Sequence, residues 1–113
     1  MDCLFCRVAN GELPTEIIYE DDTVLAFRDI NPQAPTHGLV IPKRHIASIN
    51  HATSDDAELL GNMVLAAKHV AAQEGLHDNG YRLVFNINNH GGQTVYHIHL
   101  HVLGGRQMTW PPG

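Results

Sequence analysis

Residues 94–103 read Thr-Val-Tyr-His-Ile-His-Leu-His-Val-Leu, which places three histidines at two-residue intervals between aliphatic residues. In a β-strand, successive side chains point to opposite faces. The pattern therefore predicts a strand whose aliphatic face packs in the core and whose imidazole face is free for chemistry. The three histidines on that face are His97, His99 and His101.

Three imidazoles on one strand indicate a metal site or nucleophilic catalysis, because an inert strand rarely carries several histidines in register. Residues two apart lie roughly 6.6 Å from each other, whereas a zinc–nitrogen bond is about 2.1 Å. One ion would therefore bind one or two of these rings, with other ligands from elsewhere. A catalytic row fits the spacing better, since neutral imidazole is a nucleophile and proton carrier near pH 7.

The length and charge of the chain limit its organisation and its partners. With 113 residues, the chain is expected to form a single domain, residues 1–113. Seven Lys and Arg against twelve Asp and Glu give a formal charge of −5, which argues against nucleic-acid binding. The N-terminal residues resemble neither a secretory signal nor a membrane anchor, so we expect a cytoplasmic protein without membrane contact.

The rest of the sequence predicts a sheet covered by one long helix. Patterns typical of strands occur at residues 16–20, 23–28, 38–42 and 81–86. A helix is expected from the capping residues 53–56 to Glu74, because apolar residues recur there at three- and four-residue steps. A short helix is expected at residues 5–10. The fold class is therefore α+β, an antiparallel sheet of about five strands with a long helix on one face.

Cys3 and Cys6 form a Cys-x-x-Cys pair near the start of the chain. A thiol redox motif, half of a zinc site and two unrelated thiols are all compatible with this spacing. A thioredoxin-like motif would lie beside a βαβ unit, which the sequence does not show. A zinc site would need two further ligands.

Four segments of the chain together resemble the histidine triad (HIT) superfamily, and in particular its histidine triad nucleotide-binding branch. The alternating histidines of residues 97–103 are similar to the superfamily signature. Residues 29–37, 91–94 and 104–113 are similar to other segments of that branch. The similarity covers almost the whole chain. It implies a HIT-like fold in which two sheets pair into a homodimer.

The resemblance also implies an activity, that of a purine nucleoside phosphoramidate hydrolase that releases an amine and a nucleoside monophosphate such as AMP. His99 would attack the α-phosphorus and form a nucleotidyl-histidine, which water would then cleave. His101 would stabilise the phosphate oxygens, while Thr94 and His37 would assist departure of the amine. His97 completes the triad. Catalysis would require no metal or other cofactor.

Further residues are implied to bind the purine nucleotide. An aspartate at a strand end commonly forms a turn, but its carboxylate is also suited to accept hydrogen bonds from ribose hydroxyls, and Asp29 matches that position. Ile30 would contact the nucleoside, and Phe27 would contact the base. The remaining contacts would come from Asn86, Gly92, Gln93 and Thr94, together with His99 and His101.

A structural zinc site is implied as well, because many bacterial relatives hold zinc with an N-terminal cysteine pair and two histidines. The matching residues here are Cys3, Cys6, His45 and His97. Other members of the branch lack both the cysteines and the metal. If zinc is bound, His97 is not a free proton carrier.

Three positions depart from the common pattern of the branch. Thr94 stands where Ser is common, which keeps the hydroxyl but stiffens the side chain. Asn88 stands at a common glycine position, which asparagine tolerates because it accepts left-handed backbone geometry. His90 replaces a common acidic residue, and nothing in the sequence explains this change.

Two other functions are also compatible with the sequence. A metal-dependent hydrolase that uses the histidine row would lose activity on chelation and regain it with zinc. A noncatalytic purine nucleotide-binding regulatory protein would bind a nucleoside monophosphate tightly without turnover. Trp110, near the C-terminus, would help select the leaving group or contact the other subunit.

Overall fold

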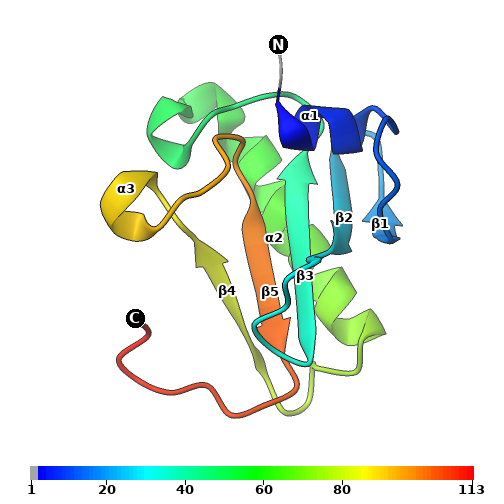
Figure 1. Cartoon of the computed structure of the whole chain (residues 1–113), viewed down its shortest axis with the longest axis vertical. Helices are drawn as coiled ribbons and strands as arrows, with labels where there is room; N and C mark the ends of the chain where they lie inside the picture. Colours follow the sequence, from blue (N-terminus) through cyan, green and yellow to red (C-terminus); the bar gives the residue numbers. More distant parts are fainter. Residues whose placement is uncertain (1–2) are drawn as a thin grey trace.

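The computed structural model describes residues 3–113, and it contains a five-stranded antiparallel sheet in the order β1-β2-β3-β5-β4 (Figure 1). The strands are β1 (Ile17–Glu20), β2 (Val24–Arg28), β3 (Thr36–Pro42), β4 (Tyr81–Phe85) and β5 (Leu100–Gly104). The helices are α1 (Leu4–Ala9), α2 (Ala57–Gln73) and α3 (Asn88–Gly91), with 3₁₀ turns at Ile49–His51 and Ser54–Asp56. The predicted α+β fold is confirmed. None of the helices in the described residues is long and apolar enough to cross a membrane.

Alternate residues of the strands supply two hydrophobic cores on opposite faces of the sheet. The long helix α2 lies behind the sheet in Figure 1 and packs on one face against Val24, Val40 and Val102. On the other face, Leu25 and Leu39 belong to a second core that includes residues of α1. Burial of each such side chain contributes roughly 1.5–3 kcal/mol, so the alternation stabilises both layers.

The capping signal predicted for the long helix is present at its N-terminal end. The Thr53 hydroxyl accepts a hydrogen bond from the Asp55 N–H at 3.2 Å, and the Asp56 carboxylate accepts one from the Thr53 N–H at 2.9 Å. These bonds form a capping box around the 3₁₀ turn that leads into α2. At the other end, Gly75 takes a positive φ of 74°, which stops the helix where the sequence predicted.

The predicted histidine strand is only partly formed. Strand β5 begins at Leu100, so the prediction is wrong for residues 94–99, which precede the sheet. The Ile98 N–H donates at 2.8 Å to the carbonyl of Ile46, which lies beyond the end of β3. Pro42 at that end has no N–H with which to extend the ladder. Pairing between β3 and β5 therefore stops at Leu100, before it reaches His99 and His97.

The alternation of side chains nevertheless continues through the unpaired segment. Ile98 lies in the core beneath α2. His97 and His99 lie on the other face, where both contact the ring of Phe5, with centroids 6.1 and 5.1 Å away. The ring of His101 follows at 5.0 Å from that of His99. The predicted common face for the three histidines is therefore present without a regular strand.

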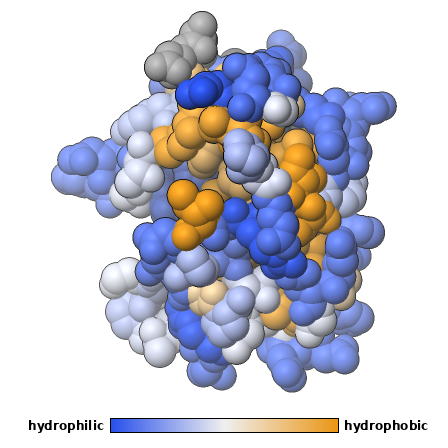
Figure 2. Space-filling view, turned by 45° about the vertical axis from the view of Figure 1, so that its right-hand side comes forward, coloured by the Kyte–Doolittle hydropathy of each residue, from blue (hydrophilic) through white to orange (hydrophobic). Residues whose placement is uncertain are grey.

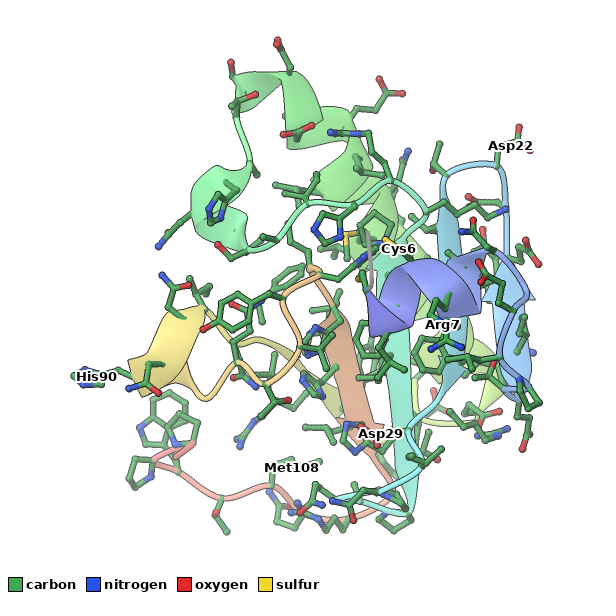
Figure 3. All side chains as sticks on the ribbon, turned by 45° about the horizontal axis from the view of Figure 1, so that its top comes forward. Cys6, Arg7, Asp22, Asp29, His90 and Met108 are labelled. Atoms are coloured by element: carbon green, nitrogen blue, oxygen red, sulfur yellow. The ribbon has the colours of Figure 1, made fainter. Side chains whose placement is uncertain are left out.

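The short helix α3 lies after β4, in a segment where the sequence predicted no helix. Its first residue, Asn88, has a φ of 57°, in agreement with the expectation that asparagine tolerates this geometry. The Asn88 N–H donates to the side-chain oxygen of Gln93 at 2.9 Å, a contact that local propensity does not reveal. His90 is exposed on this helix and points away from the molecule (Figure 3).

Candidate active site

A cavity of about 500 Å³ opens on the face of the sheet opposite α2, between α1 and the loop that follows β2. Its wall is mostly apolar, and Figure 2 shows hydrophobic surface gathered in the upper half of the view, bordered by hydrophilic residues. The predicted site residues that line it are Phe27, Asp29, Ile30, His37, Thr94, His99 and His101. A cavity of this size and character is typical of sites that bind small organic ligands.

His99 is held in one tautomer by the protein backbone. Its Nδ1 lies 2.8 Å from the carbonyl oxygen of His97, and a carbonyl can only accept a hydrogen bond. Nδ1 therefore carries a proton, and in the neutral ring the lone pair is on Nε2. The ring is buried, and Phe5 packs edge-on against it. His99 thus presents Nε2 with a defined orientation at the cavity.

A chain of hydrogen bonds that starts at a backbone N–H also fixes which ring nitrogens of His37 and His101 carry protons. The Gln33 N–H donates to His37 Nδ1 at 3.0 Å, so His37 carries its proton on Nε2. That nitrogen donates to His101 Nδ1 at 2.8 Å, and His101 therefore carries its proton on Nε2. His101 Nε2 is buried and has no hydrogen-bond partner within residues 3–113. The site thus holds a buried N–H donor without an acceptor.

Burial keeps both of these histidines neutral. It lowers the pKa of His101 to about 4, and the neighbouring His99 and His37 act in the same direction while Asp29 opposes them. Burial also lowers the pKa of His37, against the opposing effect of the Asp29 carboxylate. At neutral pH, therefore, the relay from the Gln33 N–H to His101 contains no charged imidazole.

The two carboxylate oxygens of Asp29 have different partners. Oδ1 accepts a hydrogen bond from the Asn31 N–H at 2.8 Å, which forms the turn after β2. Oδ2 lies 3.4 Å from His37 Nε2, and the residue lines the cavity. Figure 3 shows Asp29 in the loop between β2 and β3. The turn-forming and ligand-binding interpretations of this residue are thus compatible.

The four predicted metal ligands meet beside the cavity, with donor atoms within 4.8 Å of one another; they are Cys3, Cys6, His45 and His97. Figure 3 shows sulfur atoms next to imidazole rings at Cys6. His97 Nε2 donates to the carbonyl of Pro42 at 2.8 Å, so its bare Nδ1 faces Cys3 Sγ at 3.4 Å. Two sulfurs and two imidazole nitrogens suit a tetrahedral zinc ion, and a carbonyl behind the histidine is typical of such sites.

Comparison with known proteins agrees with this architecture. Residues 10–108 match the family model of the HIT domain. The chain belongs to the HIT family. An uncharacterized HIT-like protein from Synechococcus elongatus is 54% identical over 112 residues, which cover 99% of this chain and 97% of that protein.

Solved structures of HIT proteins are similar along most of the chain. A HIT family hydrolase from Legionella pneumophila superposes with a TM-score of 0.97 at 64% identity, covering 99% of this chain and 100% of that chain. A histidine triad nucleotide-binding protein from Candida albicans superposes with a TM-score of 0.83 at 29% identity, covering 97% of this chain and 83% of that chain. The similarity thus extends to a eukaryotic member of the family.

Three residues predicted to bind nucleotide do not line the cavity of this HIT domain: Asn86, Gly92 and Gln93. The side-chain nitrogen of Gln93 donates to the carbonyls of Ala47 and Val95, at 2.8 and 3.1 Å. Gln93 therefore positions the segment that follows it. In that segment, the N–H groups of Thr94 and Val95 make no hydrogen bond to any residue in the described part of the chain.

Several residues that line the cavity of the HIT domain were not identified as site residues from the sequence: Leu4, Phe5, Val8, Leu13, Thr15 and Val95. The first three lie on one side of α1 at helical spacing, a signal that an apolar helix face could have provided. Thr15 belongs to no motif. Its hydroxyl is buried and has no hydrogen-bond partner among residues 3–113.

Proposed function

We propose that this HIT protein is a purine nucleoside phosphoramidate hydrolase of the adenosine 5′-monophosphoramidase type, which releases AMP and an amine. The observation that carries the proposal is the hydrogen bond from His99 Nδ1 to a backbone carbonyl, which leaves Nε2 as the attacking nitrogen at the wall of a cavity that suits a nucleotide. The names of two similar proteins support the class of activity, since one is a HIT family hydrolase and the other a histidine triad nucleotide-binding protein.

The cavity provides a separate environment for each part of the nucleotide. The base is expected among the apolar side chains of α1 and Phe27, where its flat faces displace water. The ribose hydroxyls would donate to Oδ2 of Asp29, because its other oxygen already accepts the Asn31 N–H. Ile30, which is 97% exposed, would be covered by the nucleoside. This placement directs the phosphate toward the histidines.

The reaction proceeds by in-line attack of His99 Nε2 on the α-phosphorus while the bond from phosphorus to the amine nitrogen breaks. The proton stays on Nδ1 of His99 and remains hydrogen-bonded to the His97 carbonyl. The dipole of that carbonyl stabilises the positive charge that the ring acquires. His101 Nε2–H and the N–H groups of Thr94 and Val95 would donate to the phosphate oxygens. Each of these donors lacks a partner in the described part of the chain.

The amine leaves with a proton, which the hydroxyl of Thr94 would deliver from water at this exposed position. His37 would act through His101, whose proton it keeps on Nε2. Water then attacks the phosphorus and loses a proton to the solvent, the bond to His99 breaks, and AMP is released. The imidazole returns to its neutral form, and no step requires a metal.

The test is AMP release from adenosine 5′-phosphoramidate by the purified protein, with and without a chelator. At saturating substrate, turnover that survives chelation is the expected result. Activity that disappears with the chelator and returns with zinc would favour a metal-dependent hydrolase. Tight AMP binding without turnover would favour a noncatalytic regulatory protein that binds purine nucleotides.

We also propose that Cys3, Cys6, His45 and His97 hold a structural zinc ion, which would cross-link α1 to the segment before β5. The two free thiols fit a cytoplasmic location, where thiols stay reduced. Native mass spectrometry is expected to find one zinc per chain, and Cys6→Ala should remove it. The exposed His77→Ala variant serves as the control and should keep the metal. A metal-free native chain would contradict the proposal.

A homodimer is the expected assembly. Strand β4 lies at the edge of the sheet, so one side of its backbone is unpaired, and all of its five residues are half-buried. On α2, Val64 is 42% exposed. Pairing of two β4 edges would satisfy the backbone groups and cover apolar surface. The same native mass spectrum should therefore show two chains, and a monomer at micromolar concentration would refute this assembly.

A further inference from the structure

Cys3 and Cys6 are placed to react with each other. Cys3 precedes the first turn of α1, and its sulfur accepts a hydrogen bond from the Cys6 N–H at 3.4 Å. Both thiols are free, and their sulfurs lie within 4.8 Å of each other and of the two histidine nitrogens. Cys3 is buried, whereas Cys6 is only half-buried and can be reached by a small oxidant. A disulfide would require the two sulfurs to approach to about 2.05 Å.

A disulfide between these cysteines is incompatible with zinc at the same site. Tetrahedral zinc with bonds of about 2.3 Å to sulfur holds two cysteine sulfurs about 3.8 Å apart. A disulfide holds them about 2.05 Å apart, and its sulfurs no longer carry the thiolate charge that binds a metal. Oxidation would leave His45 and His97 as the only ligands, which is too few to retain the ion.

The segment between the two cysteines is part of the cavity wall. Leu4 and Phe5 lie between them, and both line the cavity. The ring of Phe5 contacts the rings of His99 and Phe27, with centroids 5.1 and 5.5 Å away. Helix α1 has six residues, too few to be stable alone, so its position depends on what anchors it. Loss of the metal anchor would therefore disturb the wall where the base is expected to bind.

We propose that a hydroperoxide oxidises Cys3 and Cys6 to a disulfide, that zinc is expelled as a result, and that nucleotide affinity falls because α1 loosens. The inference rests on the zinc and nucleotide sites proposed above. One thiolate attacks the peroxide oxygen and becomes a sulfenic acid, while the peroxide takes up a proton and leaves as an alcohol, or as water from hydrogen peroxide. The second thiolate attacks the sulfenic sulfur, forming the disulfide and, with another proton, water. The two thiolates supply the two electrons that reduce the O–O bond.

The test treats the zinc-loaded protein with hydrogen peroxide and follows three quantities. A chromogenic chelator is expected to detect one released zinc per chain, and mass spectrometry a disulfide between Cys3 and Cys6. Calorimetry should show that the Kd for AMP rises about tenfold. A rise of this size is expected if α1 is correctly placed in only about a tenth of the oxidised molecules. Dithiothreitol followed by zinc should restore the original affinity.

The matched control is Cys3→His, which keeps four zinc ligands but cannot form the disulfide. Under the same peroxide it should retain both zinc and AMP affinity, and Cys6→His replaces it if circular dichroism shows that the first variant does not fold. Retention of zinc by the oxidised native protein, unchanged AMP affinity after zinc loss, or equal loss of affinity in the control would each overturn the inference. Failure of the reduced, zinc-loaded protein to bind AMP would instead overturn the proposed nucleotide site.

Discussion

Replacement of His99 by Asn is expected to lower kcat/KM for AMP release by about 10⁴-fold or more, because an amide nitrogen has no lone pair available for attack on phosphorus. The shorter amide can still donate to the carbonyl of His97, the partner of the native imidazole at 2.8 Å. The cavity should therefore persist, and the Kd for AMP, measured by calorimetry, should change only a few-fold. Steady-state kinetics with adenosine 5′-phosphoramidate measures the main effect.

Rapid quenching provides an independent test of the same role. With substrate labelled at phosphorus, the native protein should carry a covalent label that is stable to alkali and labile to acid, and His99→Asn should carry none. His77→Asn, at an exposed position remote from the cavity lining, serves as the matched control and should behave as the native protein. Substantial turnover by His99→Asn would show that another group attacks the phosphorus.

The free energy of unfolding is expected to fall as the pH decreases from about 6.5 to about 4, by up to about 3 kcal/mol from His101 alone. Burial lowers the pKa of His101 to about 4 in the folded protein, from an ordinary value of 6.5. In this window the unfolded chain binds the proton and the folded chain does not. The contribution is therefore fully present above pH 6.5 and is lost as the pH falls toward 4. The pKa values of His37 and His97, also lowered by burial, add in the same direction.

The carboxylates act mainly in a different range of pH. The Thr53 N–H, and after it Arg44, hold the pKa of Asp56 below its ordinary value of 3.8, so this contribution is lost mainly at lower pH. Urea unfolding of metal-free native protein and of His101→Asn at about pH 7.5, 5.5 and 4.5 separates the effects. The stability advantage of the native protein should shrink as the pH falls. Parallel curves for the two proteins would refute the assignment to His101.

Much of the fold was predictable because periodic patterns in the sequence encode which face of an element is buried. The aromatic and β-branched residues of β2 correctly predicted a strand, and the apolar stripe of α2 predicted the helix that covers the sheet. The extent of the histidine strand was not predictable. It depends on where β3 ends, at Pro42, and on the Ile98 N–H finding the Ile46 carbonyl instead of a strand partner.

For the candidate site, the sequence by itself determined the residue types, from the histidine row to the cysteine pair. The tertiary structure alone decided which imidazole nitrogens carry protons, because the deciding partners are backbone groups: the Gln33 N–H and the carbonyls of His97 and Pro42. It also decided the contact between His37 and His101, which lie 64 positions apart. The physical reason is that local patterns determine the face to which a side chain points, whereas tautomers, cavity walls and lowered pKa values depend on distant groups that only folding brings together.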